Sequence, residues 1–135
     1  MVKELLKDLC ARLPYGLKCI VKSDGYVGVI SSIESQYGVV TFDDGRQEEI
    51  CDIKPCLYPL SSMTEEQKEE LKSIGWNFDN FEIHNVSECL GTYREYVAHS
   101  DCFALIDWLN KNHFDYRCLI EKSLALDATN LGIYE

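Results

Sequence analysis

The chain has 135 residues, of which 23 are acidic and 13 are basic, giving a formal net charge of −10. Such a field repels phosphate backbones, and the Lys and Arg residues are scattered, so direct nucleic-acid binding is not expected. Hydrophobic residues make up 46% of the chain, but no apolar run approaches the roughly 20 residues that a membrane helix needs. These features predict a globular, cytoplasmic protein with no membrane segment.

The number and spacing of the cysteines favour reduced thiols over disulfides. There are seven, an odd number, at the irregular positions 10, 19, 51, 56, 89, 102 and 118. Most have apolar neighbours, which is typical of buried cysteine rather than of a disulfide framework. A zinc site built from Cys51, Cys56, His84 and Cys89 is an alternative, although its spacings differ from those of tight CxxC knuckles. We therefore expect neither a metal nor another cofactor.

The chain is predicted to begin with an amphipathic helix over residues 2–12. Leu5, Leu6 and Leu9 share one helical face, and Pro14 ends the helix because the residue before a proline avoids the α region. Residues 13–60 then read as short strands separated by Gly, Asp and Ser, a spacing typical of a small barrel.

Particular residues locate the turns of this barrel. The sequence Asp43-Asp44-Gly45-Arg46 predicts a type I′ hairpin, in which both central residues have positive φ. Gly28 within a strand predicts a bulge or a tight bend. Pro55 and Pro59 argue against a central strand beyond Lys54, because proline cannot donate to a ladder.

The second half is expected to be mainly helical. Ser62 and Glu65 form a capping-box pattern that predicts a helix reaching Ile74. Residues 76–83 alternate as an additional strand or an extended arm, and residues 84–98 are ambiguous. Asp101 caps a helix that breaks near His113, and Asp115 caps a last helix, YRCLIEKSLALDA, so the two form a helical hairpin. His113 with Asp107 and Asp115 could hold a general base, but capping and a favourable His–helix-dipole contact explain the same residues.

These elements predict an α+β fold: a small SH3-like β-barrel with an N-terminal helix and a C-terminal helical hairpin. The expected division is residues 1–60, containing the first helix and the barrel, and residues 61–135, a helical part packed on the barrel. A single domain is the alternative division. No Gly-rich phosphate loop and no glycine-flanked nucleophile occurs, so we expect no catalytic residues and no enzyme.

Two resemblances add to this interpretation. The segments DGYVGVISSI and GVVTFDDGRQEEICDIKP, within residues 18–60, resemble SH3-like barrels of the Tudor class. The resemblance implies peptide binding, in some members through an aromatic cage around a methylated cation. Tyr26, Tyr37 and Phe42 would supply the cage here, and Asp44 stands where the family pattern often has a further aromatic.

The second resemblance covers more of the chain. The segments KDLCARLPYG, LYPLSSMTEEQKEEL and DWLNKNHFDYRCLIEKSLALDAT look like a group of uncharacterised small proteins encoded by phages and prophages of gut bacteria. The resemblance implies an accessory phage or mobile-element protein acting inside a bacterial cell on a host or defence component. It brings no catalytic residue or ligand.

The leading hypothesis is a non-catalytic interaction module that binds a protein, a peptide or a small ligand in the bacterial cytoplasm. The alternative is phage counter-defence, either as an acidic nucleic-acid mimic or as an oligomer that sequesters a nucleotide signal. Sequestration would need an aromatic residue for the base and a cation for the phosphate, and the candidates are Tyr93, Arg94 and Arg117.

Overall fold

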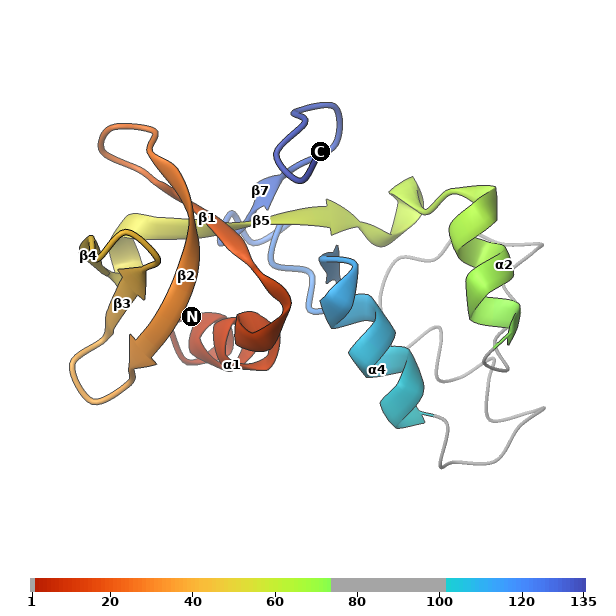
Figure 1. Cartoon of the computed structure of the whole chain (residues 1–135), viewed down its shortest axis with the longest axis horizontal. Coiled ribbons are helices and arrows are strands. Elements are labelled where there is room, and N and C mark those ends of the chain that lie inside the picture. Colours follow the sequence, from red (N-terminus) through yellow and green to blue (C-terminus); the bar gives the residue numbers. More distant parts are fainter. Residues whose placement is uncertain (1, 74–101) are drawn as a thin grey trace.

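The protein is described by a computed structural model covering residues 2–73 and 102–135 (Figure 1). The predictions for residues 76–98, including Tyr93, Arg94, His84 and Cys89, lie outside these residues. The described elements are α1 (Val2–Arg12), η1 (Leu13–Tyr15), β1 (Lys18–Val21), β2 (Val27–Glu34), β3 (Val39–Phe42), β4 (Gln47–Glu49), η2 (Ile50–Asp52), β5 (Ile53–Pro59), η3 (Leu60–Ser62), α2 (Glu65–Ser73), α4 (Cys102–Lys111), β6 (Phe114–Asp115) and β7 (Leu126–Asp127). The predicted α+β class and N-terminal helix are confirmed.

One sheet of seven strands runs through the described chain. Its order is β4-β3-β2-β1-β5-β6, and β7 also pairs with β5. The strands β1 to β4 pair as antiparallel neighbours, β5 returns antiparallel to β1, and the short β6 and β7 pair parallel with β5. The pairings describe an open sheet. Figure 1 shows β5 as a long strand that connects the β1–β4 hairpins with the part of the chain containing α2 and α4.

The first hydrophobic core lies between α1 and the sheet. Leu5 and Leu9 are buried one helical turn apart, as their spacing predicts, and meet the inward-facing residues of β1, where Cys19 and Val21 alternate with half-buried neighbours. Far along the chain, Leu119 and Ala125 join the same core.

The second core lies where β5 continues past β1. It gathers buried residues from η3, from the link between η3 and α2, from α2 and α4, and from the segment around β6: Leu60, Met63, Leu71, Leu105, Leu109, Phe114 and Tyr116. The long strand β5 therefore contributes to the frame of both cores.

The structure changes three predictions about the sheet. The register shift falls between Ile30 and Ser32, not at Gly28. In the hairpin between β3 and β4 only Gly45 has positive φ, so the turn is not type I′ although the predicted hairpin forms.

Strand β5 continues to Pro59, contrary to the prediction from its prolines. Lys22 donates its backbone N–H to the Asp52 carbonyl, so alternation makes Cys19 and Pro55 a pair that exchanges no ladder hydrogen bonds. The missing N–H of Pro55 therefore costs the β1–β5 ladder nothing.

The start of α2 also differs from the prediction. The capping box forms two residues later than expected, between Thr64 and Gln67. The Gln67 side chain accepts the Thr64 N–H at 2.9 Å, and the Thr64 hydroxyl accepts the Gln67 N–H at 3.2 Å. Ser62, the expected cap, instead donates its hydroxyl to the Pro59 carbonyl in η3.

The last predicted helix is wrong, and with it the helical hairpin. Helix α4 ends at Lys111, close to the predicted break, but residues 116–125 form turns. Cys118 and Ser123 have φ of 59° and 61°, in the left-handed region, which a right-handed helix does not contain. Leu119 is still buried, so its apolar character serves a packed loop.

Candidate functional site

Two of the predicted binding residues meet at one end of the β1–β4 hairpins. Tyr26 packs edge-on against Phe42, with ring centroids 5.4 Å apart. A Cβ at Gly28 would lie 2.8 Å from the Tyr26 hydroxyl oxygen and 3.0 Å from the Phe42 ring, so glycine is needed to let Tyr26 lie flat over β2. Phe42 is itself buried and contributes to the core, so Tyr26 presents the accessible ring of the pair.

A guanidinium already lies on that ring. The central carbon of Arg46 is 4.6 Å from the Tyr26 ring centroid, within the range of a cation–π contact. Arg46 Nη2 donates to Asp24 at 2.8 Å and Nε donates to Glu48 at 2.9 Å. The Tyr26 hydroxyl donates to Asp44 at 2.5 Å. We call these five residues the acidic rim.

Electrostatic effects agree with this geometry. Hydrogen bonding to Arg46 lowers the pKa of Asp24, and the Tyr26 hydroxyl lowers the pKa of Asp44. The Arg46 pKa is raised by its bonds to Asp24 and Glu48. In the acidic rim, the shifted pKa values of Asp24 and Asp44 favour their ionised forms beside one flat cation. Sequence reasoning missed Arg46, although its place in the turn opposite Tyr26 offered a signal.

The other predicted binding residues lie elsewhere. Tyr37 is 70% exposed in the turn between β2 and β3. Arg117 lies after β6, with its Nε 3.4 Å from the Asp8 carboxylate. Tyr93 and Arg94 are outside the described residues, so the nucleotide-binding set stays a prediction.

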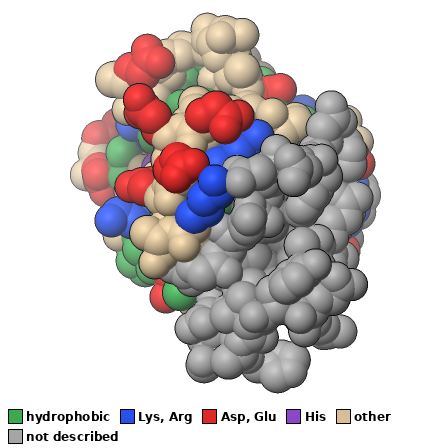
Figure 2. All heavy atoms as spheres, turned by 90° about the vertical axis from the view of Figure 1, so that its right-hand side faces the viewer, with side chains coloured by type: hydrophobic (Ala, Val, Ile, Leu, Met, Phe, Trp, Pro, Cys, Tyr) green, Lys and Arg blue, Asp and Glu red, His purple; other side chains and the backbone are tan. Residues whose placement is uncertain are grey.

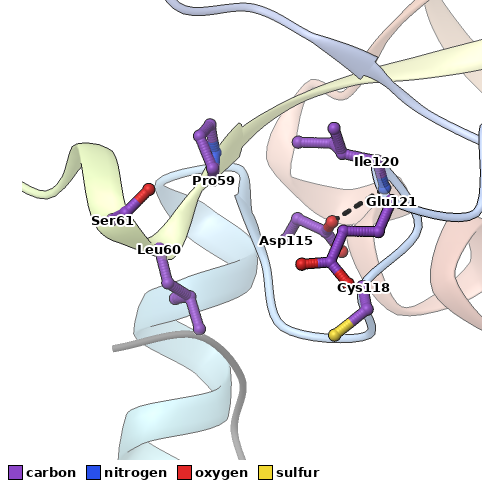
Figure 3. Close-up of a pocket in the computed structure, with 7 residues that line it drawn as sticks. All are labelled: Pro59, Leu60, Ser61, Asp115, Cys118, Ile120 and Glu121. Carbon is purple, nitrogen blue, oxygen red and sulfur yellow. Dashed lines mark hydrogen bonds between the residues drawn. The ribbon is translucent and has the colours of Figure 1, made fainter. Parts of the chain in front are cut away.

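A small pocket of about 80 Å³ opens where β5 meets η3 (Figure 3). Pro59, Leu60 and Ser61 line one side, and the other side is lined by Asp115 of β6 and, in the loop after it, Cys118, Ile120 and Glu121. Asp115 is fully engaged, because its two oxygens accept backbone N–H groups from Arg117, Leu119 and Ile120 at 2.9 to 3.2 Å. It acts as a cap for this loop and is not placed as an acid or a base.

His113 has a different environment from the one expected of a cationic helix end. Its ring stacks on Tyr134 with centroids 3.9 Å apart, its Nδ1 is buried without a hydrogen-bond partner, and its φ is 63°. Burial lowers its pKa to about 4, so the ring is neutral near pH 7. Asp107 is exposed on α4, and we find no shared role for it with His113 and Asp115.

A buried ionic cluster joins α1 to the segment around β6. Asp8 and Arg12 are fully buried and pair at 2.8 Å, while Arg12 also donates to the Phe114 carbonyl. The guanidiniums of Arg12 and Arg117 lie 5.0 Å and 5.2 Å from the Tyr116 ring centroid. Burial raises the pKa of Asp8 despite the opposing effect of Arg12. The cluster ties the first helix to residues more than a hundred positions later.

Residues that could share a metal ion differ from the predicted zinc set. Among the described residues, Glu49, Cys51 and Asp52 bring three ligand atoms within 4.8 Å of one another, all on exposed side chains. Cys56 is instead buried as a reduced thiol, with a pKa raised to about 11 by burial. Cys51 and Cys56 therefore have separate environments.

Figure 2 shows acidic side chains beside Lys and Arg on the described part of the molecule's α2 side. Helix α2 itself carries four exposed glutamates, and Lys68 and Lys72 pair with Glu65 and Glu69 at 3.4 Å and 3.0 Å. Such exposed pairs contribute little to stability and leave a mixed surface.

Comparisons with known proteins add no relative: no family model, curated protein or solved structure matches this chain. Within residues 2–73 and 102–135, none of the helices combines the length and the apolar character needed to cross a membrane.

Proposed function

We propose that the protein is a non-catalytic interaction module whose acidic rim binds a cationic side chain, arginine above all, from a basic segment of a partner protein, in the place that Arg46 occupies here. The observation that carries this proposal is the seat of Arg46: its guanidinium lies on Tyr26 and donates to Asp24 and Glu48. A planar cation with forked donors fits this arrangement better than a lysine ammonium does. The net charge of −10 would speed the approach of such a partner.

The setting of this function is also proposed. We infer that residues 18–60 act as an SH3-like barrel, which is supported by the order β4-β3-β2-β1-β5 and by η2 preceding β5. The partner would be a host or phage protein in the cytoplasm of a bacterial cell, in keeping with the resemblance to phage-encoded accessory proteins.

The test is an NMR titration of the labelled protein with three peptides of equal length, rich in arginine, lysine or glutamate. The arginine peptide is expected to shift the amide signals of Asp24, Tyr26 and Arg46. The lysine peptide should shift the same signals less, and the glutamate peptide should leave them unchanged. Raising the salt concentration should weaken the binding, because the pairs are exposed.

Matched variants locate the site. Asp24→Asn and Glu69→Gln each remove one exposed carboxylate that pairs with one cation, at 51% and 68% exposure. We expect Asp24→Asn to weaken the arginine peptide at least fivefold and Glu69→Gln to leave it unchanged. Equal effects of the two variants would mean that only net charge attracts the peptide, and the proposal would fail.

A further inference from the structure

Tyr134, which follows β7, places its side chain against the backbone of Lys18 in β1 and Cys56 in β5. We call the space that holds this side chain the slot. The register of β1 and β5 pairs Cys19 with Pro55, so Lys18 and Cys56 are the next pair in line. Alternation along the ladder would join them by backbone hydrogen bonds. Where one of these bonds would run, from the Lys18 N–H to the Cys56 carbonyl, the Tyr134 hydroxyl lies instead: it accepts the Lys18 N–H at 3.0 Å and donates to the Cys56 carbonyl at 2.8 Å.

The walls of the slot recognise the aromatic ring. The His113 ring stacks on Tyr134 at 3.9 Å with an interplanar angle of 10°, and Tyr58 lies at 5.9 Å. The Lys18 ammonium is 5.7 Å from the Tyr134 ring centroid and donates to the Ile133 carbonyl at 2.7 Å. The slot therefore contacts three groups of its occupant: an aromatic ring, a hydroxyl that both accepts and donates a hydrogen bond, and the neighbouring backbone carbonyl.

The segment that delivers Tyr134 is held mainly by this contact. Within residues 129–135, the hydrogen bonds to strands β1 and β5 are made by Ile133 and Tyr134. Leu131 is 53% exposed, and Asn130 and Gly132 have left-handed φ near 65° in the turn that leads to the tyrosine. A segment that is held to the sheet mainly by one side chain, at the end of a short turn, can be exchanged between chains, as in domain swapping.

We propose that the slot is a tyrosine-binding site, filled here by the chain's own Tyr134 and able to take a tyrosine on an extended segment of another chain. The Cys56 carbonyl requires a hydroxyl donor, so phenylalanine and phosphotyrosine would both be rejected. The site is separate from the acidic rim, so it does not depend on the proposed function above.

The test uses a peptide with the sequence of residues 129–135 and the full chain carrying Tyr134→Ala. We expect this variant to bind the peptide at least 100-fold more tightly than the natural chain, whose attached tyrosine competes at millimolar effective concentration. A peptide with Phe at the tyrosine position should bind at least tenfold more weakly, because two buried polar groups of the slot lose their partner.

Each other outcome is decisive. Equal binding by the natural chain and the variant would place the peptide elsewhere, and equal binding of the Tyr and Phe peptides would reduce the slot to an apolar cleft. If Tyr134→Ala does not fold, Tyr134→Phe keeps the ring but weakens the internal competitor. The Tyr134→Phe variant should then bind the natural peptide about tenfold more tightly than the unaltered chain does. If the variant binds no more tightly, the proposal is overturned.

A sedimentation experiment distinguishes the two sources of the incoming tyrosine. Exchange between copies should give a dimer of the natural chain that grows with concentration and is lost in Tyr134→Ala. A monomer at all concentrations, together with peptide binding to the variant, would assign the slot to a different protein.

Discussion

The β1–β4 hairpins and the segment from His113 to Tyr134 are held in different ways. The hairpins have antiparallel ladders, with one register shift between Ile30 and Ser32, over an apolar core, and their polar side chains pair at the surface. The later segment has two strands of two residues each and several left-handed residues. Its position depends on polar side chains that contact backbone, including the buried Arg12 and Asp115 and the partly buried Tyr134.

The comparison shows where single side chains should matter most. A ladder shares its stability among many hydrogen bonds, so losing one surface contact has little effect. A loop held by one carboxylate or one guanidinium loses its position when that group is removed, since the buried partners are left without hydrogen bonds. We make four predictions from this comparison, ordered from the largest expected effect on stability to the smallest.

Asp8→Ala should have the largest effect. It leaves Arg12 fully buried without its paired carboxylate, which is expected to cost about 3–5 kcal/mol in the free energy of unfolding. Urea denaturation measures this loss. Glu4→Ala is the control, because Glu4 makes an exposed pair with Lys122 at 2.9 Å and its removal should change the unfolding midpoint little. Similar losses in both variants would contradict the role assigned to burial.

Asp115→Ala should come next, at about 2 kcal/mol, because three backbone N–H groups lose their acceptor at once. Asp127→Ala removes a carboxylate that caps a single N–H, from Thr129, and should cost less. Amide hydrogen exchange offers a direct measurement: Leu119 and Ile120 are expected to lose protection in the first variant, while the amides of β2 and β3 keep theirs.

His113 should make stability depend on pH between about 4 and 6.5. Its folded pKa of about 4 lies below the ordinary value, so in this range the unfolded chain binds a proton that the folded chain does not. Stability contributed by the neutral ring is therefore complete above pH 6.5 and is lost as the pH falls toward 4. His113→Asn, which tolerates the left-handed backbone, should flatten this part of the curve. An unchanged slope would contradict the prediction.

Tyr26→Phe should have the smallest effect. It removes the hydroxyl that bonds to Asp44 but keeps the ring against Phe42 and under Arg46. Because these groups are exposed and the ladders are untouched, the thermal midpoint should stay close to that of the natural chain. A large drop would show that the acidic rim stabilises the hairpins, contrary to the comparison above.

The same difference explains how far the sequence could predict the structure. Alternation in β1, the Asp-Gly turn and the Leu5–Leu9 spacing are local signals, and the structure confirms the elements they predicted. The spacing of Leu119, Ile120 and Leu124 also fits a helix, but Asp115 captures three backbone amides and Cys118 turns left-handed. Side-chain capture of the backbone overrode the periodic pattern there.

The candidate sites were less predictable for a related reason. Tyr26 and Phe42 were proposed from their residue types, but the role of Arg46 depends on Asp24 in the turn between β1 and β2. Tyr134 meets Lys18 across 116 positions, and nothing near either residue in the sequence indicates that contact. Local patterns locate strands and turns, whereas these sites depend on which turns and strands the fold brings together.

The pairing of β5 with the distant strands β6 and β7 bears on the order in which the sheet can form. On the ribosome, the first five strands are synthesised before residues 114–127, so the edge of β5 that pairs with β6 and β7 stays unpaired until those strands follow. The nascent hairpins can form early, but the sheet reaches its final state only once residue 134 has left the exit tunnel. Contacts so distant along the chain slow folding, and until they form the edge of β5 is open to other nascent chains.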